Sequence, residues 1–377
     1  MTVVDPAAAT AAYLQRLPAS ALAAAPADTV RNELLLAVSV CVVVLAAWAV
    51  ARSGLLARIE GRMRAAGRPE WMWDSACGAA LAGLIGLSLA PLALMDGVGA
   101  AAKAAAVTGA LRQAAVLSLM GALAAPGIYG LIRRLPRFWA PLLGGLAGLA
   151  VFAAVWAPFA GASGPASLPP APQGAARAGL VRLIAETRLP ASEVYVSANP
   201  AIDADVTGLG AARVVVSRGL WNRASPEELR ASVGHLIGHY VNHDQLSIAV
   251  LLAALALGLF LALQTLHARA AWLLGLPASP ADPAGAPAMA LIAAVYLSGA
   301  VIVDHAFIRA INVRADQYSL DHAHEPDGLA MALVHEWRGE QVDPSPAQEA
   351  LFYDHPALAG RLEHAMRWKV TQATQAG

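Results

Sequence analysis

The stretch SVGHLIGHYVNHD, residues 232–244, repeats histidine at every fourth position just before a long apolar segment. In an α-helix, residues four apart lie one above the other on the same face. His235 and His239 can therefore direct two ring nitrogens at one metal ion, as the histidines of an H-E-x-x-H motif do. His243 follows one turn later, and Leu236 stands where that motif has its glutamate. The stretch predicts a helical metal site from which one chemical group is missing.

The composition indicates a membrane protein and excludes several other classes. Of the 377 residues, 58% are hydrophobic and only 14% are charged, which is far from the balance of a soluble domain. The formal net charge is zero, and this argues against nucleic acid as a partner. The two cysteines, Cys41 and Cys77, lie inside apolar stretches, so a disulfide framework or a four-cysteine zinc site is excluded.

Apolar stretches that approach a membrane-spanning length occur six times. A helix needs roughly 20 apolar residues to cross the hydrocarbon core of a bilayer. The candidates are Leu34–Ala51, Ser75–Met95, Ala114–Ile132, Phe138–Ala160, Ile248–Leu263 and Pro287–Val303. The fifth is short, and it can begin earlier if it continues the histidine helix. We therefore predict a mainly α-helical, multi-pass membrane protein in contact with lipid.

A more polar region between the fourth and fifth stretches predicts a small α+β unit. Residues Ala175–Arg188 have the apolar spacing of an amphipathic helix. SEVYVSA (192–198) and ARVVVS (212–217) have the branched residues of strands, and TGLG (207–210) indicates a turn before the second. Ser225, Pro226 and Glu228 fit an N-cap, a first helical residue and a capping box for the histidine helix.

The sequence VHEWRGE, residues 334–340, contains a second histidine–glutamate pair. The position four residues after His335 is Gly339, so no second imidazole follows at the spacing of a zinc motif. We predict an ordinary amphipathic helix there. For the whole chain we predict three parts: an N-terminal segment (1–33), a four-span region (34–160), and a domain (161–377) with two further spans at about 248–263 and 287–303.

Several short motifs in a fixed order give the chain a family resemblance. They are TGLG (207–210), ARVVVSRGLW (212–221), SPEELRASVGHLIGHYVNHD (225–244), IRAINVRADQYSL (308–320) and FYDHPALAGRL (352–362). With them the chain resembles the membrane-embedded zinc metallopeptidases that include the type I CAAX prenyl proteases and HtpX-like proteins. The resemblance implies a zincin-like (gluzincin) α+β peptidase unit among membrane helices. It also implies one zinc ion, an internal chamber that takes a peptide or membrane-protein segment, and residence in a bacterial inner membrane.

The resemblance assigns site residues and shows which of them are replaced. His235 and His239 match the two metal ligands, Leu236 stands in place of the general-base glutamate, and Asn312 stands in place of a third, glutamate ligand. The family's aspartate that orients a ligand histidine is matched by Asp316. The distal His355, Pro356 and Arg361 also match the family. Asp203 and Ala204 occupy the positions where the family binds substrate backbone with an edge strand.

The two replacements predict a protein whose catalysis is impaired or lost. Leucine cannot accept a proton, and general-base catalysis is worth about 10²–10⁴ in rate. Catalytic zinc uses three protein ligands plus water, and an asparagine offers only a neutral amide oxygen. We therefore expect a pseudopeptidase that holds zinc weakly or not at all. Two alternatives stay open: an active metalloendopeptidase whose site is completed by Asp316 or His305, and a purely structural membrane protein.

Overall fold

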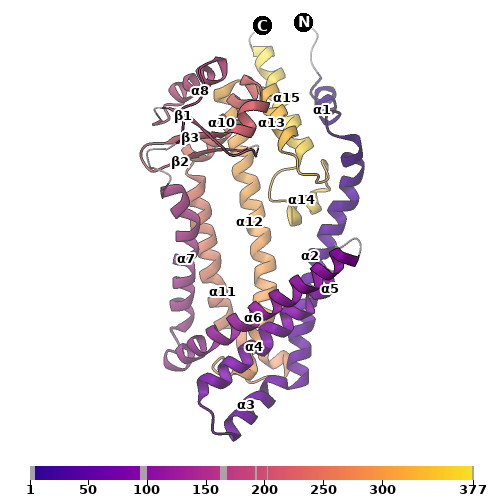
Figure 1. The fold of residues 1–377 in the computed structure, drawn as a ribbon, viewed down its shortest axis with the longest axis vertical. Coiled ribbons are helices and arrows are strands. Elements are labelled where there is room, and N and C mark those ends of the chain that lie inside the picture. The colour runs from indigo at the N-terminus through magenta and orange to yellow at the C-terminus, as the bar shows by residue number, and fades with distance from the viewer. Residues whose placement is uncertain (1–4, 94–99, 162–167, 192, 202, 376–377) are drawn as a thin grey trace. The chain divides into compact units, whose positions relative to one another are not determined.

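The computed structural model describes residues 5–93, 100–161, 168–191, 193–201 and 203–375. Helices form most of the chain, and three short strands lie between them (Figure 1). The elements before the sheet are α1 (Pro6–Leu14), α2 (Ala19–Ser53), α3 (Leu55–Ala65), α4 (Glu70–Ser88), α5 (Ala90–Ala93), α6 (Ala100–Arg134), α7 (Trp139–Gly161) and α8 (Ala175–Glu186). The strands are β1 (Val194–Ser197), β2 (Ala204–Thr207) and β3 (Arg213–Ser217). After them come α9 (Arg218–Arg223), α10 (Pro226–Val241), α11 (Asp244–Leu274), η1 (Pro283–Gly285), α12 (Ala286–Ala323), α13 (Pro326–Glu336), α14 (Pro346–Phe352) and α15 (Leu358–Gln375).

Within the described residues, six helices are long and apolar enough to cross a membrane, and each overlaps one of the six predicted stretches. They cover Ala19–Ser53, Glu70–Leu92, Ala104–Arg134, Trp139–Ala160, Asp244–Leu274 and Pro283–Ala323. The multi-pass α-helical prediction is thereby confirmed. The predicted end of the second stretch, Met95, lies outside the described residues. The fifth helix is much longer than its apolar stretch, because polar residues at both ends continue the helical turns.

The fifth helix does not continue the histidine helix. Helix α10 ends at Val241, and His243 adopts a left-handed backbone conformation with φ of 56°. At the helix end, the backbone N–H and the side-chain amide of Asn242 both donate to the carbonyl of Gly238, at 3.1 and 2.8 Å. His243 therefore lies in the turn between two helices, and only His235 and His239 share the helical stripe.

The chain divides into two compact units. One contains Met1–Val30, Val151–Leu252 and Ile302–Gly377, and the other contains Arg31–Ala150 and Ala253–Val301. In the second unit, α4 and α6 are held together by small polar side chains that bond to backbone. The hydroxyl of Ser75 donates to the carbonyl of Ala122 at 2.9 Å, and that of Ser118 donates to Ala79 at 3.0 Å. Such contacts need close helix packing, which small residues permit in lipid.

The first unit contains a three-stranded sheet with the order β1-β3-β2. Strands β1 and β3 are parallel, and β2 pairs antiparallel with β3. The predicted turn TGLG joins β2 to β3, with positive φ at Gly208 and Gly210, a conformation that favours glycine. One face of the sheet is covered by α8 and α10, whose apolar residues bury Val194, Val214 and Val216 completely. Each fully buried side chain of this size contributes roughly 1.5–3 kcal/mol.

The start of α10 differs in one respect from the predicted capping box. Ser225 is the N-cap, and its hydroxyl accepts a hydrogen bond from the backbone N–H of Glu228 at 3.2 Å. The carboxylate of Glu228, however, bonds to Nδ1 of His335 at 2.7 Å on α13. The buried Glu228 thus connects α10 to α13. His335 of the VHEWRGE segment is its partner, a contact that the amphipathic pattern of that segment did not predict.

Helix α10 crosses α12 at very short range. A Cβ atom added at Gly238 would lie 3.1 Å from the Cα of Ala315 and 3.0 Å from the Cβ of Tyr318. One turn further along α12, the hydroxyl of Ser319 donates to the carbonyl of Ala231 on α10 at 2.7 Å. This crossing puts the stripe that carries His235 and His239 directly beside the polar face of α12.

Candidate metal centre on helices α10 and α12

The two histidines of α10 direct their Nε2 atoms at each other. The two nitrogens lie 3.0 Å apart, and the rings meet edge to face, with centroids 4.6 Å apart and an interplanar angle of 84°. Both side chains are only partly exposed, at 15% for His235 and 25% for His239. The four-residue spacing predicted from the sequence therefore produces a convergent pair of imidazoles.

A carboxylate holds the other ring nitrogen of each histidine. Nδ1 of His235 lies 2.7 Å from Oδ1 of Asp316, and Nδ1 of His239 lies 2.8 Å from Oδ2 of Asp244. Each aspartate is in turn paired with an arginine. Arg361 of α15 bonds to both carboxylate oxygens of Asp316 at 2.7 Å, and Arg314 of α12 bonds to Oδ1 of Asp244. Two Asp–Arg pairs thus orient the two rings.

These contacts fix the chemistry of the facing nitrogens. An ionised carboxylate only accepts hydrogen bonds, so each Nδ1 carries the proton and each Nε2 presents a lone pair. Burial lowers the pKa of His235, although the hydrogen bond that its ring donates to Asp316 opposes this effect. The ring of His235 is accordingly neutral at pH 7. Two lone pairs that face each other repel, and a cation between them, either a proton or a metal ion, removes the repulsion.

The residues present fit two ligands of a zinc ion but not the full set of a catalytic one. Zn–N bonds of about 2.0–2.1 Å in tetrahedral geometry place ligand nitrogens roughly 3.4 Å apart, close to the 3.0 Å between the Nε2 atoms. Within the described ranges, no group of three histidine, cysteine, aspartate or glutamate side chains is placed to share one ion. Asp316 cannot serve easily as a third ligand, because His235 and Arg361 already occupy both of its oxygens.

Leu236 and Asn312, where the family resemblance predicts glutamates, carry an apolar side chain and a neutral amide. Leu236 packs against the apolar cluster between the sheet and α10. Asn312 is buried, with 5% of its surface exposed, and its amide nitrogen donates to the carbonyl of Ile308 at 2.9 Å. Asn312 lies one turn before Asp316 on α12, the face that Asp316 uses to reach His235. An uncharged amide therefore stands where a carboxylate ligand is expected.

The remaining predicted residues lie at varying distances from the pair. Arg361 joins it through Asp316, whereas His355 bonds to its neighbour Asp354 at 2.9 Å and is half exposed. His305 lies three turns before Asp316 on α12, and its charge acts on Asp354. The structure therefore brings Asp316 and Arg361 to the histidines, whereas no hydrogen bond joins His305 or His355 to the pair among the described residues.

Asp203 and Ala204 lie at the edge of the three-stranded sheet. Ala204 begins β2, which is the outer strand beside β3. The backbone N–H of Ser217 donates to the carbonyl of Asp203 at 2.9 Å. Of the residues predicted to contact substrate backbone, Ala204 therefore begins and Asp203 directly precedes a strand whose outer side pairs with no strand in the described part of the chain.

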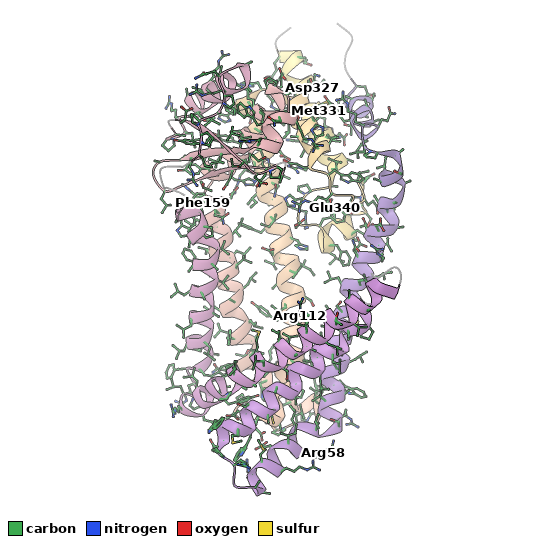
Figure 2. All side chains as sticks on the ribbon, in the orientation of Figure 1. Arg58, Arg112, Phe159, Asp327, Met331 and Glu340 are labelled. Atoms are coloured by element: carbon green, nitrogen blue, oxygen red, sulfur yellow. The ribbon has the colours of Figure 1, made fainter. Side chains whose placement is uncertain are left out.

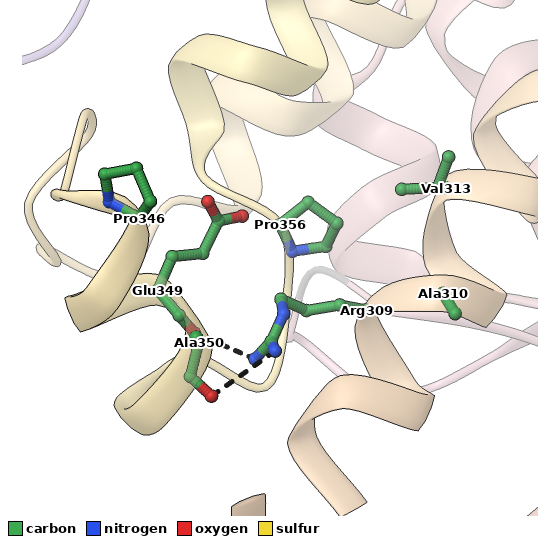
Figure 3. A pocket seen from close by; sticks show the side chains of 7 residues that line it. All are labelled: Arg309, Ala310, Val313, Pro346, Glu349, Ala350 and Pro356. Carbon is green, nitrogen blue, oxygen red and sulfur yellow. Dashed lines mark hydrogen bonds between the residues drawn. The ribbon is translucent and has the colours of Figure 1, made fainter. Parts of the chain in front are cut away.

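A pocket of about 360 Å³ lies beside α12 and next to Pro356 (Figure 3). Its wall contains the guanidinium of Arg309, which donates to the backbone carbonyls of Glu349, Ala350 and Tyr353 at the end of α14. The carboxylate of Glu349 accepts from the backbone N–H of Ala357 at 3.1 Å. The other side chains that line the pocket are apolar: Ala310, Val313, Pro346, Ala350 and Pro356.

Two supporting residues were not identified from the spacing of histidines. Asp244 and Arg314 hold His239, but Asp244 follows a turn whose left-handed geometry the sequence pattern did not predict. Tyr240, which follows His239 on α10, packs against Phe159 of α7. The two rings are tilted by 37°, with centroids 5.9 Å apart, and Figure 2 labels Phe159 near the sheet. A signal for Asp244 existed in its position as the first residue of a long helix, where aspartate is favoured.

Comparison with protein families and curated proteins gives consistent results. The model of Peptidase family M48 matches residues 170–369. A Protease HtpX homolog of Syntrophobacter fumaroxidans is 28% identical over 187 residues, which cover 48% of this chain and 65% of that protein. A Protease HtpX homolog of Desulfatibacillum aliphaticivorans is 29% identical over 189 residues, covering 48% and 59%. The chain thus spans less than two thirds of the length of these curated relatives.

A solved structure has a similar fold. The crystal structure of S. mikatae Ste24p superposes with a TM-score of 0.50 at 15% sequence identity, covering 76% of this chain and 74% of that one. At this identity the likeness concerns the fold alone. Together with the six apolar helices, these comparisons confirm an integral multi-pass membrane protein of the bacterial inner membrane type.

Proposed function

Because this chain belongs to peptidase family M48, we propose that it is a membrane-bound member that binds peptides and has lost the hydrolytic step. The observation that carries the proposal is that the two histidines of α10 are oriented as metal ligands, whereas the residues expected to supply the base and the third ligand are not acidic. Two imidazoles converge at 3.0 Å and are held by carboxylates, yet the neighbouring positions are Leu236 and Asn312. The framework of a peptidase site is retained, while the base and the anionic ligand are absent.

Loss of the base removes the group that would deprotonate an attacking water. General-base catalysis contributes about 10²–10⁴ in rate, and a leucine side chain packed on an apolar cluster has no proton acceptor. The apolar side chain of Leu236 also makes the immediate surroundings of His235 less polar than those of a site that must hold an attacking water. Peptide binding does not depend on this group, because it uses the sheet edge and the cavity walls.

We infer that His235 and His239 form a weak two-ligand site for zinc. A bound zinc ion would polarise a nearby carbonyl oxygen, as zinc does in metallopeptidases. Asp316 and Asp244 would keep both Nε2 atoms directed at the ion. Without a third anionic ligand, affinity is expected to fall well below that of a three-ligand site.

The direct test restores the two missing carboxylates. The full chain with Leu236→Glu and Asn312→Glu, purified in detergent with zinc, should cleave an unfolded fluorescent protein substrate at least about 100-fold faster than the parent, in line with the value of a general base. The parent should show no cleavage above background. The supporting measurement is zinc content, which should rise toward one ion per chain in the double variant.

Three controls decide between the possible outcomes. Adding His235→Ala to the double variant should abolish the gained cleavage, and thermal unfolding should show that each variant is folded. Cleavage by the parent that a chelator blocks would contradict the proposed loss of activity and establish an active enzyme with a rearranged site. A folded double variant that binds zinc but cleaves nothing would contradict the retained peptidase framework and favour a structural role.

A further inference from the structure

The outer side of strand β2 presents backbone groups with which no described strand pairs. In an antiparallel pair, hydrogen-bonded and non-hydrogen-bonded residue pairs alternate. The bond from Ser217 N–H to the carbonyl of Asp203 and the register Asp205↔Val215 place residues 203 and 205 in the bonded pairs. Ala204 and Val206 therefore direct their N–H and C=O groups to the other side. Within the part of the chain that the structure describes, no strand pairs with that side.

The side chains of β2 alternate between an apolar and an acidic face. Val206 is buried, with 5% of its surface exposed, and Ala204 packs against the same apolar cluster. Asp203 and Asp205 point to the opposite face and are exposed. Alternate residues on a strand lie roughly 6.5–7 Å apart, so the two carboxylates form a short acidic row beside the open edge.

The two carboxylates lack a direct counter-ion. Among the described residues, neither makes an ion pair within 4.0 Å. Partial loss of hydration raises the pKa of Asp205 and the negative charge of Asp203 raises it further, while a hydrogen bond from the backbone N–H of Val206 and the charge of Arg213 offset these effects only in part. The row is therefore an unneutralised negative site that a cation would stabilise.

We propose that β2 binds an extended peptide that carries lysine or arginine at alternate positions, with its cationic side chains opposite Asp203 and Asp205. The inference rests on the proposed peptide-binding function and adds the chemical class of the peptide. A peptide strand that pairs with Ala204 and Val206 has the same two-residue period as β2. Its alternate side chains consequently lie opposite the two carboxylates, at a Cβ separation of about 4.5–5.5 Å.

Opposite charges on adjacent strands contribute a definite but moderate affinity. Directly opposed pairs are worth up to about 1 kcal/mol each, which corresponds to up to about fivefold in the dissociation constant. Two pairs therefore give a preference of up to about 25-fold over an uncharged peptide. Because the carboxylates are exposed, added salt should reduce this preference.

The test compares three peptides on the full chain in nanodiscs of uncharged lipid. The first is a short fluorescent peptide with lysine at alternate positions, and the others have glutamine or glutamate in place of lysine. By fluorescence anisotropy, the lysine peptide should bind most tightly and the glutamate peptide most weakly. Asp205→Asn should weaken the lysine peptide by up to about fivefold and leave the glutamine peptide unchanged.

Charge reversal and a matched control complete the experiment. Asp203→Lys with Asp205→Lys should make the glutamate peptide the preferred ligand, a gain that misfolding cannot produce. Asp343→Asn removes an exposed carboxylate away from the sheet and should change nothing. Equal binding of the three peptides, or a lysine preference that survives the Asp203 and Asp205 variants, would overturn the inference and leave the proposed peptide binding in place. Failure of every peptide to bind would overturn both.

Discussion

The two histidines of α10 are held by the same chemistry in two different settings. His235 is held by Asp316, which is paired with Arg361. The side chains of Asp316 and Arg361 are almost buried, with 3% and 11% of their surfaces exposed. His239 is held by Asp244 and Arg314, and there the guanidinium is 51% exposed. In the first arrangement Arg361 makes two bonds to the carboxylate, whereas in the second Arg314 makes one.

The difference shows that one arrangement connects elements and the other mainly orients a ring. Asp316 links α10, α12 and α15, three helices that are far apart in the sequence. Asp244 begins α11 only five residues after His239, so its contact with that ring is local, and its one bond to α12 comes from the half-exposed Arg314. We therefore expect changes around His235 to affect stability most, and changes around His239 to affect mainly how the Nε2 atom is presented.

The largest expected effect is the loss of the buried cation. Arg361→Met leaves Asp316 buried and unneutralised, which should destabilise the first unit by about 3–5 kcal/mol. Arg314→Met should cost clearly less, because the guanidinium is half exposed and water already screens its charge, although Asp244 itself is buried. Thermal unfolding in detergent, followed by tryptophan fluorescence, should show a much larger drop in the transition temperature for Arg361→Met. Equal drops would contradict the distinction between the two arrangements.

The sequence predicts one of these arrangements better than the other. The four-residue spacing locates His235 and His239, and the NVRAD motif locates Asp316, because helical periodicity is local and regular. The resemblance of the distal segment also indicates Arg361. Asp244 and Arg314 were not predicted, since their meeting depends on the left-handed turn at His243 and on a helix pair that crosses only in three dimensions.

A similar limit applies to the fold. Hydrophobic length alone was sufficient to predict all six membrane helices, because a bilayer demands a long apolar run. Local capping rules predicted the start of α10 correctly but assigned the Glu228 side chain to the helix end. In the structure that carboxylate binds His335, more than 100 residues later. No local pattern specifies a contact between such distant segments.

An intermediate effect is expected on metal affinity. Removing the charge that holds a ligand histidine costs about 10–100-fold in affinity. Asp244→Asn should weaken binding of Zn²⁺ by this amount while the protein stays folded, because the amide has the same size and keeps an oxygen that can accept from His239 or Arg314. Isothermal titration with Zn²⁺ measures it, and Asp343→Asn is the matched exposed control. Unchanged affinity in the folded Asp244→Asn chain would show that His239 is not a ligand.

The smallest effect comes from the helix crossing that both arrangements share. Gly238 lies between the two histidines, and a methyl group there would meet Ala315 and Tyr318 at 3.1 and 3.0 Å. Overpacking costs about 1–3 kcal/mol, and the better helix propensity of alanine returns about 1 kcal/mol. Gly238→Ala should therefore lower stability by about 1 kcal/mol. In α8, a methyl group on Gly179 meets nothing within 4 Å, so Gly179→Ala should raise stability. If both substitutions stabilise the protein, α10 and α12 can separate without cost, and the orientation of His235 must come from Asp316 alone.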